Sequence, residues 1–235
     1  MKPRLLNGCA KSVPIVEAFE AQGWDAWTCD ILPSEGWHKH IQDDVLNHLN
    51  DGWDMAIFHP DCTYLANSGV HWLHRKEGRW EKMVESAQFF KRLHDADIPK
   101  IVIENPIPHR YAIEIIGRKY DQIIQPYDFG EDASKATCLW LKGVTPLQPT
   151  QFIEPHYACR CGSTYRFEYA LGKYGCPNCE GEYTARLVWA NQTKSGQNRL
   201  APSATRKADR SRTYQGIAQA MAEQWGYSPP QGQGD

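Results

Sequence analysis

The sequence predicts an α/β fold in which helices cover both faces of a mostly parallel sheet. Short apolar runs alternate with segments of helical spacing over residues 1–143, and polar residues follow the ends of several runs. Such alternation is typical of sheets whose parallel strands are joined by helices, and these sheets bind ligands beyond the carboxyl ends of the strands. The chain has 235 residues, 41% of them hydrophobic, which suffices for one such domain and a small insert.

The expected strands are short apolar runs that end at polar or turn-forming residues. They cover residues 4–6, 24–29, 53–58, 100–103, 122–124 and 138–141. A first helix is expected over residues 13–22, with Ser12 as its cap, Pro14 in its first turn and Gly23 at its end.

A second helix is expected over residues 80–96, because its apolar residues recur at helical spacing. We expect its aromatic residues Trp80, Phe89 and Phe90 to lie in the core rather than on a surface that stacks bases.

The sequence divides into four parts. Residues 1–143 form the expected catalytic core, and residues 144–205, which are richer in Pro, Gly and Cys, form a small insert. Residues 206–227 regain a helical pattern and are expected to return to the core. Residues 228–235, SPPQGQGD, are expected to be a disordered tail.

The charge and the hydropathy pattern exclude some classes of protein. The net charge is −2, from 26 Lys and Arg against 28 Asp and Glu, so any nucleic-acid surface must be local. No apolar run is long enough to cross a bilayer, and the N-terminus lacks a signal-peptide pattern, so we expect a cytoplasmic protein without a membrane partner. In that reducing setting the eight cysteines are expected to be metal ligands, nucleophiles or core residues.

Two motifs follow neighbouring strands of the expected sheet. Cys62 comes just after a strand, in a Pro-Asp-Cys turn, where partial exposure and nearby backbone donors favour thiolate chemistry. A buried core cysteine is the alternative. Glu104 and Asn105 end the next central strand, so Glu104 is expected to face the same cleft as Cys62.

Together these motifs resemble the cytosine-5 DNA methyltransferase family, and more specifically its compact phage and prophage members. In that family a Pro-Cys motif supplies the nucleophile and a Glu-Asn motif holds the target base, with about forty residues between them, as here. The resemblance implies a Rossmann-like class I methyltransferase sheet, S-adenosyl-L-methionine as cofactor, DNA as partner and, for a phage protein, the cytoplasm of the bacterial host.

The resemblance also implies a cofactor site. A turn after the first strand takes the place of the family's glycine-rich turn, and an acidic residue after the second strand takes that of the ribose-binding residue. A further acidic residue faces the adenine amino group. The residues implied are Leu6, Asn7, Gly8, Asp30, Ile31, Asp44, Val45 and Pro60. The segment from Tyr214 to Ala218 resembles the family's final motif, whose helix packs on the cofactor site.

The chain departs from the family pattern in three places. Ala10 replaces the second glycine of the turn, and Asp61 stands where the family prefers a second proline. The family's Gln-x-Arg-x-Arg motif is missing, and Lys135 is the candidate to take over part of its electrostatic role as a third catalytic residue.

Candidate substrate contacts lie in three segments. Asn105 and Pro106 follow Glu104, and Asn67 and Ser68 follow the nucleophile loop, where they form either part of a base pocket or an ordinary turn. Residues 186–212 hold seven basic residues against one acid, a balance that suits phosphate contacts, although a solvated loop is the alternative. The basic candidates there are Arg206, Arg210 and Arg212.

Two cysteine pairs in the insert predict a structural Zn²⁺ site. Cys159 and Cys161 are separated by one residue, Cys176 and Cys179 by two, and fourteen residues lie between the pairs. Four thiolates at such spacing form a closed zinc site with no open position for catalysis. Redox or unrelated cysteines are the alternative, and His156 is a substitute ligand.

The resulting hypothesis is methyl transfer from S-adenosylmethionine to carbon 5 of cytosine in DNA through a covalent Cys62 adduct. Two alternatives remain open. The same cysteine chemistry can act on another pyrimidine or on a free nucleotide, or the chain can be a non-catalytic module that binds nucleic acid or a partner.

Overall fold

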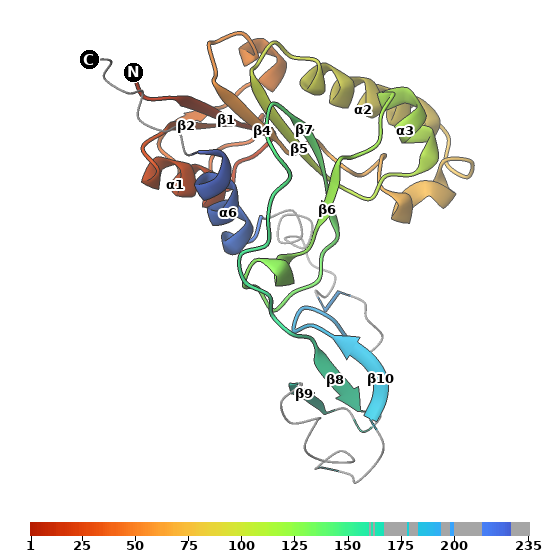
Figure 1. Cartoon of the computed structure of the whole chain (residues 1–235). Coiled ribbons are helices and arrows are strands. Elements are labelled where there is room, and N and C mark those ends of the chain that lie inside the picture. The colour runs from red at the N-terminus through yellow and green to blue at the C-terminus, as the bar shows by residue number, and fades with distance from the viewer. Residues whose placement is uncertain are drawn as a thin grey trace. The chain divides into compact units, whose positions relative to one another are not determined.

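The computed structural model describes residues 1–159, 161, 163–166, 178, 183–193, 198–199 and 213–226 (Figure 1). They belong to two compact units, which are described separately. The first comprises Met1–Ile124, Ala136–Gln148 and Ile217–Asp235, and the second comprises Gln125–Lys135 and Pro149–Gly216. The tail expected at residues 228–235 lies outside the described residues.

The first unit is built on a seven-stranded sheet with the order β3-β2-β1-β4-β5-β7-β6 in the described part of the chain. Strands β1 to β5 pair in parallel, whereas β7 is antiparallel to β5 and to β6. The strands are β1 (Arg4–Gly8), β2 (Asp25–Cys29), β3 (His40–Ile41), β4 (Met55–Phe58), β5 (Lys100–Pro106), β6 (Gln122–Ile124) and β7 (Thr137–Lys142). This confirms the expected α/β class with a mostly parallel sheet.

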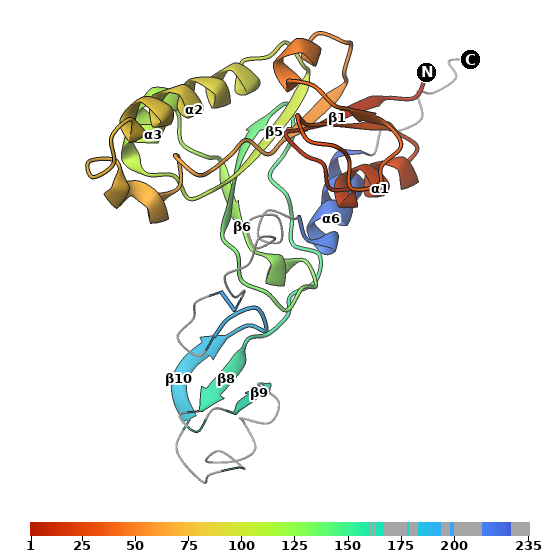
Figure 2. The ribbon, with the colours of Figure 1, turned by 180° about the vertical axis from the view of Figure 1, so that it is seen from behind.

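Helices α2 (Arg79–His94) and α3 (Arg110–Ile116) lie side by side (Figures 1 and 2) and cover one face of the sheet. Phe58 and Ile103 of the sheet belong to the same buried cluster as Phe90 of α2. The Phe90 ring packs edge-on against Trp140 of β7, with 4.8 Å between the ring centroids. Phe90 therefore joins the helix layer to the sheet, as the helical spacing predicts.

We expect Phe90→Ala to lower the free energy of unfolding by about 3–5 kcal/mol, because it leaves a cavity in a fully buried cluster. Urea unfolding followed by circular dichroism measures this loss. The exposed neighbour Gln88 on the same helix provides the control, since Gln88→Ala should change the free energy by less than about 0.5 kcal/mol. Equal midpoints for the two variants would contradict the packing described here.

Helices α1 (Pro14–Ala21) and α6 (Gln215–Trp225) lie next to each other in both ribbon views (Figures 1 and 2). Alternate residues of a strand point to opposite faces, so Leu5 and Ile57 point away from the face that α2 and α3 cover. The Trp24 ring meets Phe19 of α1 edge-on, and its Nε1 donates to the carbonyl oxygen of Gly226 at 2.7 Å. These contacts connect α1 to the C-terminal helix.

Three local predictions are wrong or incomplete. The cap of α1 is Val13, not Ser12, and no side chain bonds the first turn; Pro14 at the start of the helix has no N–H to be capped. Strand β5 continues to Pro106 because its last three residues pair with β7. Trp80 was expected in the core but is 38% exposed in the first turn of α2.

The described part of the second unit contains a three-stranded antiparallel sheet with the order β10-β8-β9. Its strands are β8 (His156–Cys159), β9 (Thr164–Arg166) and β10 (Tyr183–Val188). The rings of Tyr127 and Trp189 stack in the same unit, with centroids 4.5 Å apart. Among the described residues, no helix combines the length and apolar character needed to cross a bilayer.

Candidate active site

Three adjacent strands bring polar side chains together at one edge of the sheet. β1, β4 and β5 are neighbours, so Asn7 of β1, His59 after β4 and Glu104 of β5 end at the same edge. His59 Nδ1 lies 3.4 Å from Glu104 Oε2, and His59 Nε2 lies 3.0 Å from Asn7 Oδ1. Asn7 and Glu104 are both buried, so these contacts form a polar chain under the surface.

His59 is not among the residues predicted from the sequence. A polar residue directly after a buried strand is nevertheless the same signal that points to Cys62. The pairing of His59 with Glu104 depends on the order of β4 and β5 in the sheet, which the sequence alone does not show.

Cys62 begins a turn that is held on both sides. The amide N–H of His59 donates to the carbonyl oxygen of Gly8 at 3.0 Å, and Asn105 Nδ2 donates to the carbonyl oxygen of Pro60 at 3.0 Å. The carbonyl oxygen of Cys62 accepts from the amides of the third and fourth residues that follow it. Cys62 is half-buried in this turn, which satisfies the partial exposure expected of a reactive thiol.

Asn105 holds the Cys62 turn and is itself almost fully buried, with an exposed fraction of 2%. Its Oδ1 atom is also buried and accepts no hydrogen bond from the described residues. The structure therefore places Asn105 beneath Pro60, where it links the turn to β5. Pro106 is half-buried and pairs with Thr137 of β7.

The segment after Cys62 is tied to the segment after β5 through His109. His109 Nδ1 accepts from the amide of Ala112 at 3.1 Å, so Nε2 carries the proton and donates to the carbonyl oxygen of Tyr64 at 2.9 Å. The amide of Asn67 donates to the carbonyl oxygen of Ile107 at 2.9 Å. The side chains of Asn67 and its neighbour Ser68 are exposed in the short helix η2 (Asn67–Trp72).

The predicted glycine turn after β1 has an unusual backbone. Cys9 has φ of 55°, a left-handed conformation that glycine adopts most easily. Gly8 is needed for packing: a Cβ there would lie 2.6 Å from the Phe58 ring and 2.8 Å from Val45 Cγ2. Leu6, Val45 and Pro60 are buried too, so these three side chains belong to the core of this edge.

Two carboxylates lie near this turn. Burial raises the pKa of the Cys9 thiol, and the negative charges of Asp30 and Asp44 raise it further. Asp30 Oδ1 accepts from the amide of Leu32 at 2.9 Å, and Asp44 Oδ1 caps the short helix η1 (Val45–His48) by accepting from Leu46 N. Ile31, between them in sequence, is 72% exposed. The predicted acidic residues Asp30 and Asp44 thus lie near the Cys9 turn.

Aromatic and basic side chains form a further surface, which we call the aromatic–basic surface. The Trp80 ring contacts Tyr111 at 5.3 Å and His74 at 5.7 Å between centroids. Lys76 Nζ lies 4.6 Å from the centre of the Trp72 ring, and the Trp72 side chain is 39% exposed. The surface comprises Tyr64, Trp72, His74, Lys76, Arg79, Trp80, Lys82, Arg110 and Tyr111.

The aromatic–basic surface is built partly from the two segments that follow Cys62 and β5 in the chain. Arg79 Nη2 donates to the carbonyl oxygen of Thr63, the residue after Cys62, and its guanidinium lies 5.0 Å from the Tyr64 ring. Tyr111 belongs to α3, which follows β5. The residues come from separate stretches of chain, which is why helical spacing alone predicts a core position for Trp80.

The remaining predicted residues belong to the second unit or lie outside the described residues. The amide of Lys135 donates to Gln125 Oε1 at 2.9 Å, and its Nζ lies 6.0 Å from the Tyr214 ring. Arg206, Arg210 and Arg212 lie outside the described residues.

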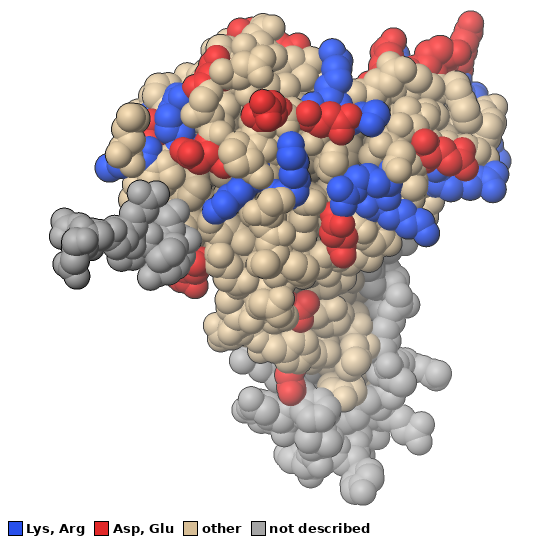
Figure 3. Space-filling model, turned by 45° about the horizontal axis from the view of Figure 1, so that its top comes forward, with Lys and Arg blue, Asp and Glu red and all other residues tan. Residues whose placement is uncertain are grey.

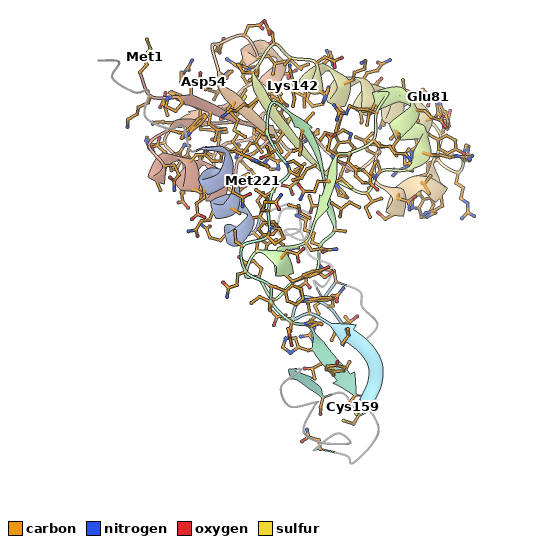
Figure 4. All side chains as sticks on the ribbon, in the orientation of Figure 1. Met1, Asp54, Glu81, Lys142, Cys159 and Met221 are labelled. Carbon is orange, nitrogen blue, oxygen red and sulfur yellow. The ribbon has the colours of Figure 1, made fainter. Side chains whose placement is uncertain are left out.

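Half of the predicted zinc ligands can be located. Cys159 ends β8 (Figure 4) and is buried, whereas Cys161 is exposed, with its Sγ 3.4 Å from Ser163 Oγ. Cys176 and Cys179 lie outside the described residues. His156 pairs instead with Asp132, at 2.5 Å. Within the part of the chain that the structure describes, no three His, Cys, Asp or Glu residues are grouped to bind a metal, so zinc stays a prediction.

No protein-family model matches the chain, and no curated protein matches it. Among solved structures, a proposed DNA modification methyltransferase encoded within an E. coli prophage is similar, with 12% identity and a TM-score of 0.40 over 65% of this chain and 52% of that chain. The methyltransferase EhMeth of Entamoeba histolytica has 14% identity and a TM-score of 0.43 over 66% and 58%. The S. pombe Dnmt2 methyltransferase has 13% identity and a TM-score of 0.36 over 62% and 50%.

This chain therefore spans between 50% and 58% of the length of these solved chains. Because the TM-scores are below 0.5, the function is inferred from the residues of this chain and not from these similar structures.

Proposed function

We propose that the protein transfers a methyl group from S-adenosylmethionine to carbon 5 of cytosine in DNA, with Cys62 as the nucleophile. One observation carries this proposal: the turn that holds the half-buried Cys62 thiol is hydrogen-bonded to the strand that holds a buried carboxyl group. Asn105 binds the carbonyl oxygen of Pro60 in the Cys62 turn, and the residue before Asn105 is Glu104. A thiolate and a carboxyl group at adjacent strand ends suit attack on a pyrimidine ring held by its edge.

The residues near the β1 turn fit the proposed cofactor. Asp30 directly after β2 and Asp44 before η1 are exposed enough to bind hydroxyl and amino groups. The negative charges of both raise the pKa of the Cys9 thiol in the turn. An acidic residue after the second strand binds a ribose in many sheets of this class. The exposed Ile31 side chain offers an apolar face for an aromatic ring. When bound, S-adenosylmethionine supplies an electrophilic methyl group.

The side chains at the sheet edge have separate roles in this proposal. The Cys62 thiolate attacks carbon 6 of the cytosine and thereby raises the electron density at carbon 5. Glu104 binds the ring nitrogen and the amino group, and stabilises the charge that develops on the ring. Later loss of the proton on carbon 5 restores the double bond and breaks the bond between the ring and Cys62. In duplex DNA the base would first have to leave the stack.

The aromatic–basic surface supports nucleic acid as the partner. On the face shown in Figure 3, Lys and Arg alternate with Asp and Glu, so a polyanion would be attracted by local groups rather than by one large field. Lys76 over Trp72 and Arg110 over Tyr111 combine a cation with a flat ring. Stacking surfaces with basic neighbours are typical of proteins that bind unpaired bases and the backbone beside them.

We expect Trp72→Ala to weaken binding of a labelled oligonucleotide about 5- to 150-fold, because stacking contributes about 1–3 kcal/mol per base. Fluorescence anisotropy at one fixed salt concentration measures this change. Ile123 on β6 has a similar exposed fraction, 42% against 39%, so Ile123→Ala provides the control. Equal affinities of the two variants would remove Trp72 from the nucleic-acid surface.

Mass spectrometry of nucleosides from cells expressing the protein tests the proposed function most directly. Enrichment of 5-methylcytosine in DNA supports it, whereas a change in another pyrimidine or in RNA would assign the Cys62 chemistry to a different substrate. Calorimetry with S-adenosylmethionine separates both outcomes from a non-catalytic module, which would bind neither the cofactor nor its demethylated product.

We also propose that the four cysteines of the insert hold a structural zinc ion. Cys159 and Cys161 lie on either side of the start of the turn between β8 and β9, and the amide of Cys159 bonds the carbonyl oxygen of Ser163 within that turn. A pair of thiols in a tight turn is one half of a four-thiolate site. Cys176 and Cys179 would provide the other half.

A further inference from the structure

The contacts of His59 restrict where its protons can be. His59 Nε2 faces Asn7 Oδ1 at 3.0 Å, and an amide oxygen only accepts, so Nε2 carries a proton. In a neutral imidazole the other nitrogen, Nδ1, then has a lone pair and also accepts. That nitrogen faces Glu104 Oε2 at 3.4 Å, an ion-pair distance.

An ionised Glu104 would place a second acceptor against the lone pair of His59 Nδ1. Both side chains are largely withdrawn from water, with exposed fractions of 16% for His59 and 9% for Glu104, so water cannot easily separate them. Two facing acceptors without a proton repel each other. One proton shared between the imidazole and the carboxyl group removes this repulsion.

We propose that His59 is a positioning residue that keeps one proton between its Nδ1 atom and Glu104, ready for transfer to ring nitrogen 3 of the target cytosine. This inference rests on the proposed function and assigns a role to a residue outside the predicted motifs. The Asn7 contact holds the imidazole in the required tautomer. The distance of 3.4 Å would shorten when the base docks, as catalytic hydrogen bonds often do.

The Cys62 thiolate forms a bond to carbon 6 while the ring electrons move toward nitrogen 3. The shared proton passes from the pair to nitrogen 3, and Glu104 then accepts the new N–H. When the proton on carbon 5 leaves to water, the double bond between carbons 5 and 6 forms again and expels the Cys62 thiolate. Nitrogen 3 then returns its proton to the pair, so the pair ends the cycle as it began, and the one proton released overall is that of carbon 5.

The first test compares His59→Gln with wild type in covalent trapping on DNA that carries 5-fluorocytosine. Glutamine can still contact Asn7 and Glu104 but cannot carry a shared proton. We expect trapping to slow on the order of 100-fold, at the low end of what general acid catalysis contributes. His94→Gln is the matched control: His94 has an exposed fraction of 17%, lies 3.1 Å from Asp95, and is in the last turn of α2. It should trap as wild type does.

A second base analogue distinguishes loss of the proton donor from a general displacement of the active-site residues. The additional ring nitrogen of 5-azacytosine makes carbon 6 more electron-poor, so attack depends less on an acid. If His59 holds the proton, His59→Gln should slow trapping on 5-fluorocytosine at least about tenfold more than trapping on 5-azacytosine. Equal slowing on both bases would overturn the proposal and leave His59 with a structural role.

A third measurement does not require activity. Long-range nitrogen spectra of the histidines in the wild-type full chain and in Glu104→Gln report the protonation of each ring nitrogen, and His59→Gln identifies the His59 signals. We expect the Nδ1 shift of His59 to change in Glu104→Gln, because its proton-sharing partner is gone. Unchanged shifts would refute the shared proton. If wild type traps neither analogue, the proposed function fails, and these spectra still decide the inference about His59.

Discussion

We expect Cys62→Ala to form no covalent adduct with DNA carrying 5-fluorocytosine and to yield no methylated product. The Sγ atom is the group that would bond carbon 6, and its removal leaves no equivalent nucleophile in the turn. Loss of a nucleophile can lower turnover by up to about 10⁶-fold in enzymes that use one. Denaturing gel electrophoresis of the trapped complex measures the adduct, and nucleoside analysis measures the product.

Cys138 provides the control for this prediction. It is fully buried on β7, and burial raises the pKa of its thiol to about 12, so it is almost entirely protonated at neutral pH. Cys138→Ala should still form the adduct, and iodoacetamide should modify Cys62 much faster than Cys138 in the folded protein. An adduct of undiminished yield in Cys62→Ala would place the nucleophile elsewhere in the chain.

The second large effect is expected at Glu104, where two substitutions should behave differently. Glu104→Gln keeps one donor and one acceptor for the base edge but cannot transfer a proton, so the trapping rate should fall about 10²–10³-fold with little loss of DNA affinity. Glu104→Ala removes both contacts to the base and the partner of His59, so it should trap more slowly still.

Stopped-flow trapping and anisotropy with the same oligonucleotide separate the two effects at Glu104. Glu81 is exposed in the first turn of α2 (Figure 4), and Glu81→Gln should leave both readouts unchanged. If Glu104→Gln trapped DNA at the wild-type rate, Glu104 would have no role as a proton donor, and its burial beside His59 would need another explanation.

Much of the fold could be predicted from the sequence because its signals are local. The apolar runs before Cys62 and Glu104 are short, rich in buried side chains and end at polar residues, and they are β4 and β5 in the structure. The spacing of Met83, Ala87 and Phe90 likewise predicts the buried side of α2. The errors concern the ends of elements and the exposure of side chains. At Ser12 the outcome depends on Pro14 at the start of the helix, and at Trp80 on the neighbouring rings of Tyr111 and His74.

The candidate site was predicted only in part, for the same reason. Cys62 and Glu104 are recognisable from their own motifs, whereas a role for His59 is recognisable only from its contacts with Asn7 and Glu104. In the structure Asn105 Nδ2 donates to the carbonyl oxygen of Pro60, and its contact with the substrate stays a prediction. The aromatic–basic surface joins residues from two loops, the short helix η2 and the helices α2 and α3, which no single stretch of sequence displays.

The sequence by itself determined that this chain is an α/β protein with a Pro-Asp-Cys turn and a Glu-Asn motif at strand ends, because apolar periodicity and motif chemistry are properties of consecutive residues. Only the tertiary structure decided which side chains face each other. The order β1-β4-β5 brings Asn7, His59 and Glu104 into one buried chain. Strands pair with partners that are far away in the sequence. This pairing builds the sheet and brings residues about fifty positions apart into contact.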